Sequence, residues 1–384
     1  GLGTASKYWA SAYIDAITTT GNVAIGGALT ITGGNSGQIV VTAGNAAWDA
    51  SIDLDTTGAN EHWRIRVEGS DGTFQIGNVD QGGTSAISIH PTTKDVSVIT
   101  LNGIPFFTDA ARNSMYTHDV SGTATSADGN TAYGFGALDA ITGGDLNTVV
   151  GHLAGSAINS GSNNVLMGYA TGDALTTGSD NVAIGYAALS VEDTGAKNVA
   201  IGKSALNALN FDGDGYNVAV GYNAGTAVTL GKENTLIGGQ AGDSLTTGEK
   251  NIAIGKAALS TEDTGSRNVA VGHGALQTLN YDGTSYNVAV GYDAGVNVTT
   301  GIRNTLIGAG TGDALTTGGY NVAIGHFALS AEDTHGTNVA IGYTALYTLD
   351  AGTDAYNVAV GFEAGVAMTT GVLNTIVGGL AFNA

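Results

Sequence analysis

The chain has 384 residues with 62 glycines, only 12 lysines or arginines and no cysteine, a composition that favours a periodic structure over a compact enzyme and excludes disulfides and thiolate chemistry. The 33 acidic residues give a formal net charge of -21, which repels the phosphates of nucleic acids and anionic lipid headgroups, so neither is an expected partner. No window approaches the run of about 20 apolar residues that a membrane-spanning helix needs, so no membrane insertion is expected.

Residues 1–34 read GLGTASKYWASAYIDAITTTGNVAIGGALTITGG. They resemble a connector of many phage tail and fibre proteins, in which LGT, a tryptophan, a tyrosine-containing strand and a TGN segment follow one another. The residues that carry the resemblance are 2–4, Trp9, Tyr13, 20–22, Ile25, Gly27, Leu29 and Ile31. It implies a virion fibre subunit whose N-terminal side is attached to other tail proteins.

Residues 35–105 alternate apolar and polar side chains, as antiparallel strands do. The segment HWRIRV places Trp63, Ile65 and Val67 on one face, and a Ser-Asp-Gly turn follows it. We predict a small antiparallel β-domain that resembles a β-sandwich. Residues 106–128 lose the alternation and become rich in serine, threonine and glycine, which indicates a linker or neck.

A repeat dominates residues 129–384, and an asparagine begins each copy of its pattern Asn-x-x-apolar-Gly. The step between asparagines is 17 in the short coils, as from Asn147 to Asn164, and 19 in the long coils, as from Asn198 to Asn217. Blocks of four coils, which begin at Asn181, Asn251 and Asn321, are near-copies of one another. Repetition at a fixed period predicts a parallel β-solenoid or β-roll of about fifteen coils.

The asparagines are expected to be structural anchors that hydrogen-bond from coil to coil, because stacked amides can pair along a column. They are Asn130, Asn147, Asn164, Asn181, Asn198, Asn217, Asn234, Asn251, Asn268, Asn287, Asn304, Asn321, Asn338, Asn357 and Asn374.

Coil positions are counted here from the asparagine as position 1. Positions 2 and 4 are bulky and apolar, position 3 is usually alanine and position 5 is glycine, which predicts a short strand with one bulky and one small face. A second strand is expected over positions 8–14, followed by a turn such as Thr177-Gly178.

Each coil is short and encloses few apolar side chains, so we expect an obligate oligomer. The small face, along Ala183, Ala200 and Ala219, allows another backbone to approach closely. A homotrimer around the long axis is the simplest assembly that buries this face and protects the strand edges. The expected fold class is therefore all-β: an elongated homotrimeric fibre.

The NVAIGxxA coils, as at 181–188, resemble the head repeats of trimeric autotransporter adhesins, which form parallel β-rolls in intertwined trimers. Similar repeats occur in bacteriophage tail fibres. The resemblance covers residues 129–384, although both the short and the long coils of this chain exceed the repeat length of the adhesins.

Exposed aromatic rings are suited to stacking on sugars, so tyrosines are the candidate ligand-binding residues. Those at position 6 are Tyr186, Tyr222, Tyr292 and Tyr343, and those in the long coils are Tyr216, Tyr286 and Tyr356. Burial of these rings between coils is the alternative.

Asp212 and Asp214 resemble the start of a calcium loop, but no glutamate completes it. A protruding turn is the favoured interpretation and a calcium site the alternative; no other cofactor is expected. The pairs Glu192-Asp193, Glu262-Asp263 and Glu332-Asp333 recur once in each block and are interpreted as solvated turn charges. The seven histidines show no metal-ligand spacing.

These features predict a structural tail-fibre subunit, located in the virion and extracellular, that contacts a glycan or protein on the host surface and is not an enzyme. The alternatives are a passenger of a bacterial trimeric adhesin and a tailspike-like polysaccharide depolymerase. The chain ends at GGLAFNA without a polar cap, so we expect that a trimerisation chaperone was cleaved away or that the chain is truncated.

Overall fold

The computed structural model describes the backbone of the strands between residues 50 and 116, and residues 126–383 throughout. The chain divides into two compact units, Gly1–Ser97 and Val98–Ala384. The predicted connector at 1–34 lies outside the described residues. Among the described residues, no helix has the length and hydropathy to cross a bilayer.

The first unit contains a five-stranded sheet with the strands in chain order. β1 pairs with β2, β2 with β3 and β3 with β4, all antiparallel. The alternating segment HWRIRV forms β2, as the period-2 pattern predicts. The strands are β1 (Ala50–Asp55), β2 (His62–Val67), β3 (Phe74–Asn78), β4 (Ser85–Ile89) and β5 (Val96–Val98).

The second unit opens with two short hairpins. β6 (Thr100–Leu101) is antiparallel to β7 (Ile104–Pro105), and β8 (Phe107–Asp109) is antiparallel to β9 (Ser114–Tyr116). β9 then pairs in parallel with β10 (Thr131–Tyr133), the first strand of the repeats. The solenoid sheet thus extends into residues 106–128, the stretch for which the sequence predicts a linker.

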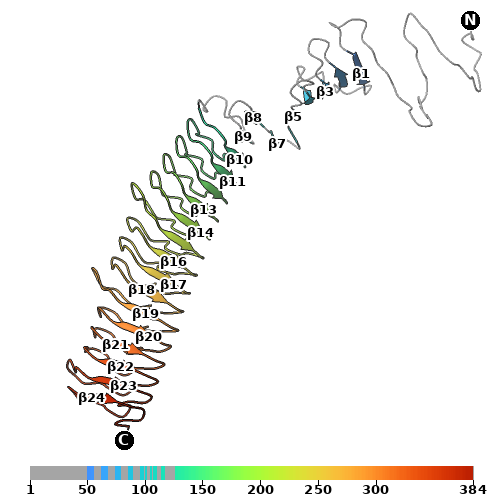
Figure 1. The fold of residues 1–384 in the computed structure, drawn as a ribbon. Helices are drawn as coiled ribbons and strands as arrows, with labels where there is room; N and C mark the ends of the chain where they lie inside the picture. Colours follow the sequence, from blue (N-terminus) through green and yellow to red (C-terminus); the bar gives the residue numbers. More distant parts are fainter. Residues whose placement is uncertain are drawn as a thin grey trace, which may run out of the picture. The chain divides into compact units, whose positions relative to one another are not determined.

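From β10 onward the chain is a parallel β-solenoid of fifteen coils, as predicted (Figure 1). Each coil contributes one three-residue strand at positions 2–4, which pairs in register with the same positions of the next coil; Val182 faces Val199, for example. The remaining strands are β11 (Thr148–Val150), β12 (Val165–Met167), β13 (Val182–Ile184), β14 (Val199–Ile201), β15 (Val218–Val220), β16 (Thr235–Ile237), β17 (Ile252–Ile254), β18 (Val269–Val271), β19 (Val288–Val290), β20 (Thr305–Ile307), β21 (Val322–Ile324), β22 (Val339–Ile341), β23 (Val358–Val360) and β24 (Thr375–Val377).

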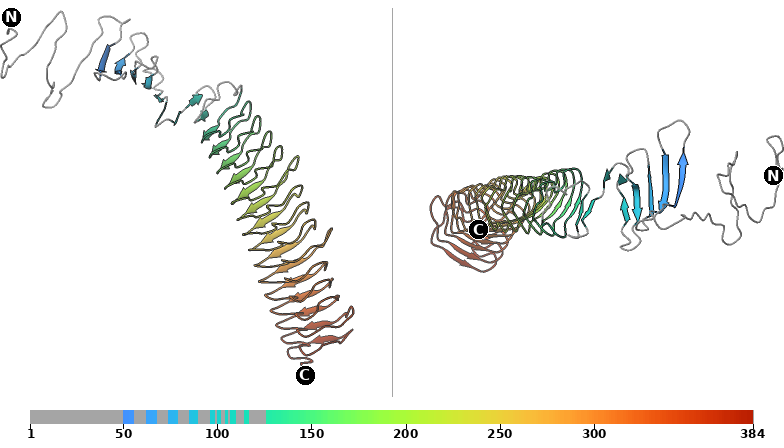
Figure 2. Two further views of the ribbon diagram at one scale, coloured as in Figure 1. Left: turned by 180° about the vertical axis from the view of Figure 1, so that it is seen from behind. Right: turned by 90° about the horizontal axis from the view of Figure 1, so that it is seen from above.

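The predicted second strand at positions 8–14 is wrong: these residues form turns, and the arrows in Figure 2 lie along one side of the coils only. The chain turns along each coil by placing non-glycine residues in the left-handed region, such as Ala187 (φ 50°) at position 7, Leu189 (φ 54°) at position 9 and Lys197 (φ 61°) at position 17. A left-handed residue interrupts an extended backbone. The short coil therefore closes through corners rather than through a second strand.

The glycine at position 5 is required by the stacking of the coils. Gly185 has a φ of 134°, and a Cβ atom there would lie 2.5 Å from the carbonyl oxygen of Gly202 in the next coil. Any side chain would force the two coils apart, because real Cβ atoms do not approach a carbonyl so closely.

The small face of the strand points into the coil, not outward. Ala183, Ala200 and Ala219 are fully buried in the core, whereas Val182 and Ile184 lie on the outer face and are only partly covered. The expectation that the alanines face another chain is therefore wrong. The coil interior is narrow, and leucines at positions 9 and 12 already fill most of it.

Core side chains at positions 3 and 9 share a fixed space. In the coil from Asn234, Leu236 at position 3 faces Gly242 at position 9, and a Cβ on Gly242 would lie 2.8 Å from the Leu236 side chain. The next coil reverses the assignment, with Ala253 at position 3 and a buried Leu259 at position 9. In each of these two coils one large side chain fills the space between the two positions.

This complementarity predicts the outcome of exchanging the two residues. We expect Leu236→Ala to lose about 2–5 kcal/mol by leaving a cavity, and Gly242→Leu to lose about 1–3 kcal/mol by overpacking. The double variant recreates the arrangement of the next coil and should recover most of the loss. Chemical denaturation measures the coupling; additive losses in the double variant would contradict the shared space.

Candidate functional site

A buried column of asparagines runs through the solenoid. Asn251 donates its backbone N–H to Oδ1 of Asn234 (2.9 Å) and its Nδ2 to the carbonyl of Gly265 (2.8 Å), and its own Oδ1 accepts the backbone N–H of Asn268 (3.0 Å). The asparagines from Asn130 to Asn357 are fully buried. These residues hold each coil in register and are not available to a ligand.

The glutamates of the three Glu-Asp pairs are also buried, which contradicts their interpretation as solvated turn charges. Glu192, Glu262 and Glu332 stand at position 12 and are fully buried, where the preceding coils carry Leu175, Leu245 and Leu315. In this position the carboxylates lie in the core and cannot reach an external substrate.

Each buried glutamate holds the long coil that follows it. Glu192 Oε1 accepts the N–H of Gly195 (2.7 Å), and its Oε2 accepts the N–H of Phe211 (3.1 Å), which begins the insertion of the next coil. Glu262 does the same with Gly265 (2.7 Å) and Tyr281 (3.3 Å). The sequence contained the signal for this role, because every long coil directly follows a coil with glutamate at position 12.

Side chains at position 6 form a partly exposed column on the outside. Phe135, His152, Tyr169 and Tyr186 stack with centroid separations of 5.7, 5.4 and 5.3 Å and interplanar angles of at most 15°. The Lys203 ammonium follows, 5.7 Å from the centroid of Tyr186 and 5.6 Å from that of Tyr222. The candidate tyrosines of this column are thus accessible at their edges, while neighbours occupy many of their faces.

The column is interrupted once in every block. Gly239, Ala309 and Gly379 occupy position 6 at equivalent places in the three blocks. A Cβ built on Gly239 would meet no atom within 4 Å, so one face of Tyr222 is left uncovered there. Tyr292, 61% exposed, precedes Ala309 in the same way.

The third block differs, because phenylalanine rather than tyrosine borders its interruption. Tyr343 stacks between His326 (5.6 Å) and Phe362 (5.2 Å), and Phe362 is the residue that precedes Gly379 in the column. Both faces of Tyr343 are therefore occupied. Among the position-6 tyrosines, only Tyr222 and Tyr292 border an interruption directly.

The tyrosines of the long coils belong to a different column, next to the asparagine. Tyr216, Tyr286 and Tyr356 are 53%, 49% and 59% exposed. The side chains of Lys197 and Arg267 lie over the rings of Tyr216 and Tyr286 at 5.2 and 5.8 Å. The structure does not bring these rings into the position-6 column.

The two calcium candidates have separate partners. Asp212 accepts a hydrogen bond from the Thr194 hydroxyl (2.6 Å), and Asp214 pairs with the Lys197 ammonium (2.7 Å). The pairing with Lys197 holds the pKa of Asp214 below its usual value. Because the lysine already neutralises Asp214, this arrangement does not favour a cation there.

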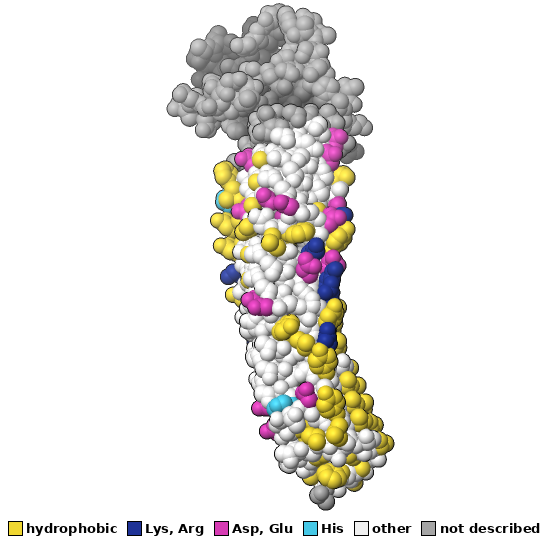
Figure 3. Space-filling model, turned by 90° about the vertical axis from the view of Figure 1, so that its left-hand side faces the viewer, with side chains coloured by type: hydrophobic (Ala, Val, Ile, Leu, Met, Phe, Trp, Pro, Cys, Tyr) yellow, Lys and Arg dark blue, Asp and Glu magenta, His cyan; other side chains and the backbone are white. Residues whose placement is uncertain are grey.

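The outer face of the solenoid sheet carries no charge over the described coils. Positions 2 and 4 of β10–β24 hold only valine, isoleucine, threonine, methionine or tyrosine. In Figure 3, hydrophobic side chains gather along the margins of the solenoid and at its lower end, and acidic and basic side chains lie among them on the margins of the upper part. In the last coil, Val377 on this face is 70% exposed.

Comparison with protein-family models, with curated proteins and with solved structures gives no match.

The buried glutamates predict a characteristic pH dependence. Burial raises the pKa of Glu262 from 4.5 to about 7, so between these values the unfolded chain releases a proton that the folded chain retains. The folded state is therefore increasingly disfavoured as the pH rises through this window. We expect Glu262→Gln to lessen the fall in melting temperature between pH 4.5 and 7, measured by circular dichroism. Glu249→Gln, which changes a partly exposed side chain, is the control, and equal slopes for wild type and Glu262→Gln would contradict the assignment.

Proposed function

We propose that this chain is a subunit of a homotrimeric virion tail fibre that contributes to attachment to the host surface. Residues 1–34 would join it to other tail proteins, as the resemblance to fibre connectors implies. The observation that carries the proposal is the uninterrupted solenoid from β10 to β24, because a rod of stacked coils presents surface groups at fixed spacing away from an attachment point.

The trimer contact is assigned to the outer strand face. This face is uncharged over all fifteen strands, although the chain as a whole carries a net charge of -21. Large exposed apolar surfaces indicate association, and a second copy offers the same uncharged columns at the same coil spacing. A closed ring of three copies satisfies each face without leaving an open edge.

A lysine on this face should dissociate the trimer. Ile254 lies on the outer face of β17, and Ile254→Lys would bury a charge in the contact, whereas Thr247→Lys changes an exposed turn residue of the same region. Sedimentation equilibrium should give three chains for wild type and Thr247→Lys, and fewer for Ile254→Lys, with circular dichroism as the test of folding. A monomeric wild type, or an unchanged mass for folded Ile254→Lys, would refute this contact.

The ligand-binding surface is assigned to the interruptions of the position-6 column. The space between Tyr222 and Lys256 spans two coil steps, roughly 9.6 Å at about 4.8 Å per step. A flat ring in contact on both sides needs about 7–8 Å, from carbon contacts of 3.5–4.0 Å. One sugar ring therefore fits against the free face of Tyr222, with the Lys256 ammonium available to its hydroxyl or carboxylate groups.

Binding of the full chain to an array of bacterial surface glycans tests this assignment. The triple variant Gly239→Tyr, Ala309→Tyr and Gly379→Tyr fills all three interruptions with the aromatic residue most common in the column, and should abolish binding while the coils remain folded. Tyr186→Ala is the control, because Tyr169 and Lys203 cover the faces of this ring. Retained binding with all three interruptions filled would exclude these sites.

A bacterial trimeric adhesin passenger is the alternative function, favoured by the resemblance of the repeats. The two differ in what the gene encodes after residue 384: an adhesin requires a coiled-coil stalk and a membrane-anchor β-barrel. Finding these segments would replace the fibre proposal.

A further inference from the structure

The third block differs from the other two at one position beside its buried glutamate. The first two blocks read Glu-Asp-Thr-Gly, ending at Gly195 and Gly265, whereas the third reads Glu-Asp-Thr-His, ending at His335. In the first two blocks a Cβ at the glycine would lie 2.5 and 2.4 Å from the glutamate carboxyl carbon. The histidine therefore enters a space that the carboxylate otherwise fills.

This exchange loosens the bonds between the glutamate and the backbone. Glu332 Oε1 accepts the N–H of His335 at 3.2 Å, and its Oε2 accepts the N–H of Ala351 at 3.5 Å, whereas the matching distances for Glu262 are 2.7 and 3.3 Å. Glu332 is nevertheless fully buried. Its carboxylate thus keeps a capacity for a further partner that the other two copies satisfy with backbone donors.

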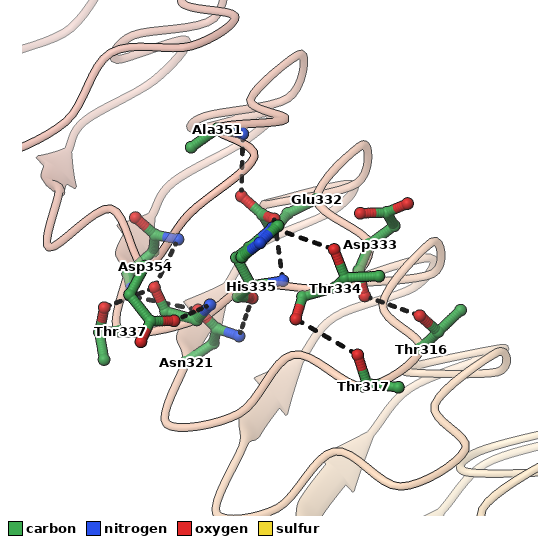
Figure 4. A network of polar contacts seen from close by, with 12 residues as sticks. Thr316, Thr317, Asn321, Glu332, Asp333, Thr334, His335, Thr337, Ala351 and Asp354 are labelled. Carbon is green, nitrogen blue, oxygen red and sulfur yellow. Dashed lines mark hydrogen bonds and ion pairs between the residues drawn. The ribbon is translucent and has the colours of Figure 1, made fainter.

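Figure 4 shows which groups surround this carboxylate. His335 Nδ1 lies 3.7 Å from Glu332 Oε1 and 3.0 Å from the Thr334 hydroxyl oxygen. One donor atom from each of Glu332, Asp333 and His335 lies within 4.8 Å of the others.

We propose that Glu332, Asp333 and His335 bind a divalent transition-metal ion of the zinc class. Imidazole nitrogen and carboxylate oxygen bind Zn²⁺ at about 2.0–2.2 Å, and two such ligands at a tetrahedral angle are roughly 3.4 Å apart. The separation of 3.7 Å between Glu332 and His335 is close to this value. The Asp333 carboxylate, with a donor atom within 4.8 Å of the other two, must turn toward them to complete the set. His335 is 31% exposed along its side chain, so the ion can enter and water can fill the remaining coordination positions.

Titration calorimetry of the tag-free full chain with zinc chloride tests the site. We expect one ion per chain, and His335→Gly should weaken binding by more than about tenfold, the lower range seen even when only an outer hydrogen-bond partner of a ligand is lost. This variant recreates the Glu-Asp-Thr-Gly sequence of the other two blocks, so it should fold. His273→Asn, which changes the histidine near Asp293, is the control and should leave the affinity unchanged.

Thermal unfolding provides a second measurement, because a ligand that binds only the folded state raises its melting temperature. Zinc should raise the melting temperature of wild type and of His273→Asn but not that of His335→Gly. The absence of saturable binding by wild type, or equal zinc affinity in wild type and His335→Gly, would overturn the proposal.

Discussion

The solenoid depends on the requirement that every coil return its asparagine to the same place above the previous one. Asn251 illustrates the constraint: its side chain bonds to the carbonyl of Gly265 in its own coil and to the backbone of Asn268 in the next. Both contacts are buried, and a buried polar group without a partner costs about 1–3 kcal/mol. The chain between two asparagines can therefore vary in side chains and even in length, provided that it closes at this point.

The long coils show how a length change is accommodated under this constraint. In a short coil the N–H at position 14 bonds to a carbonyl of the next coil, as Leu230 does with Thr246. Two extra residues displace the backbone, and the N–H at this position then needs another acceptor. Glu192 and Glu262 supply the acceptors for the N–H groups of Phe211 and Tyr281 at the start of each insertion. The cost is a buried carboxylate with a raised pKa. The glutamate belongs to the coil before the insertion because its side chain reaches the backbone of the next coil. Duplication of a whole block keeps each glutamate together with the long coil that it holds.

The coil boundaries, the strand at positions 2–4 and the parallel solenoid follow from the sequence, because the asparagine and glycine positions are set by backbone geometry that hardly varies. Which face of the strand points inward does not follow from alternation alone. Ala183 lies inside only because Leu189, in a left-handed conformation, occupies the opposite side of a narrow coil. The second strand expected at positions 8–14 is wrong because left-handed leucine and alanine residues turn the chain there, and such residues have no clear sequence signature. The burial of Glu332 and its contact with His335 likewise require coordinates, because charge and exposed turns usually occur together.

Interior side chains are constrained by the neighbouring coils, whereas exterior side chains can vary, and this difference bears directly on function. Interior positions are tied to the neighbouring coils, so substitutions there must be matched by their neighbours, as Leu236 and Gly242 are. Side chains at position 6 lie on the outside and stack mainly on the equivalent side chains of the neighbouring coils, and tyrosine, histidine, lysine and glycine all occur there. Duplication of a whole block copies an interruption such as Gly239 to Ala309 and Gly379, at a separation of roughly 19 Å, four steps of about 4.8 Å. A polymer with repeating sugars can then engage several equal and individually weak sites on one rod, and three chains around one axis multiply their number. Affinity in such an arrangement comes from the number of sites engaged together rather than from the depth of any one of them.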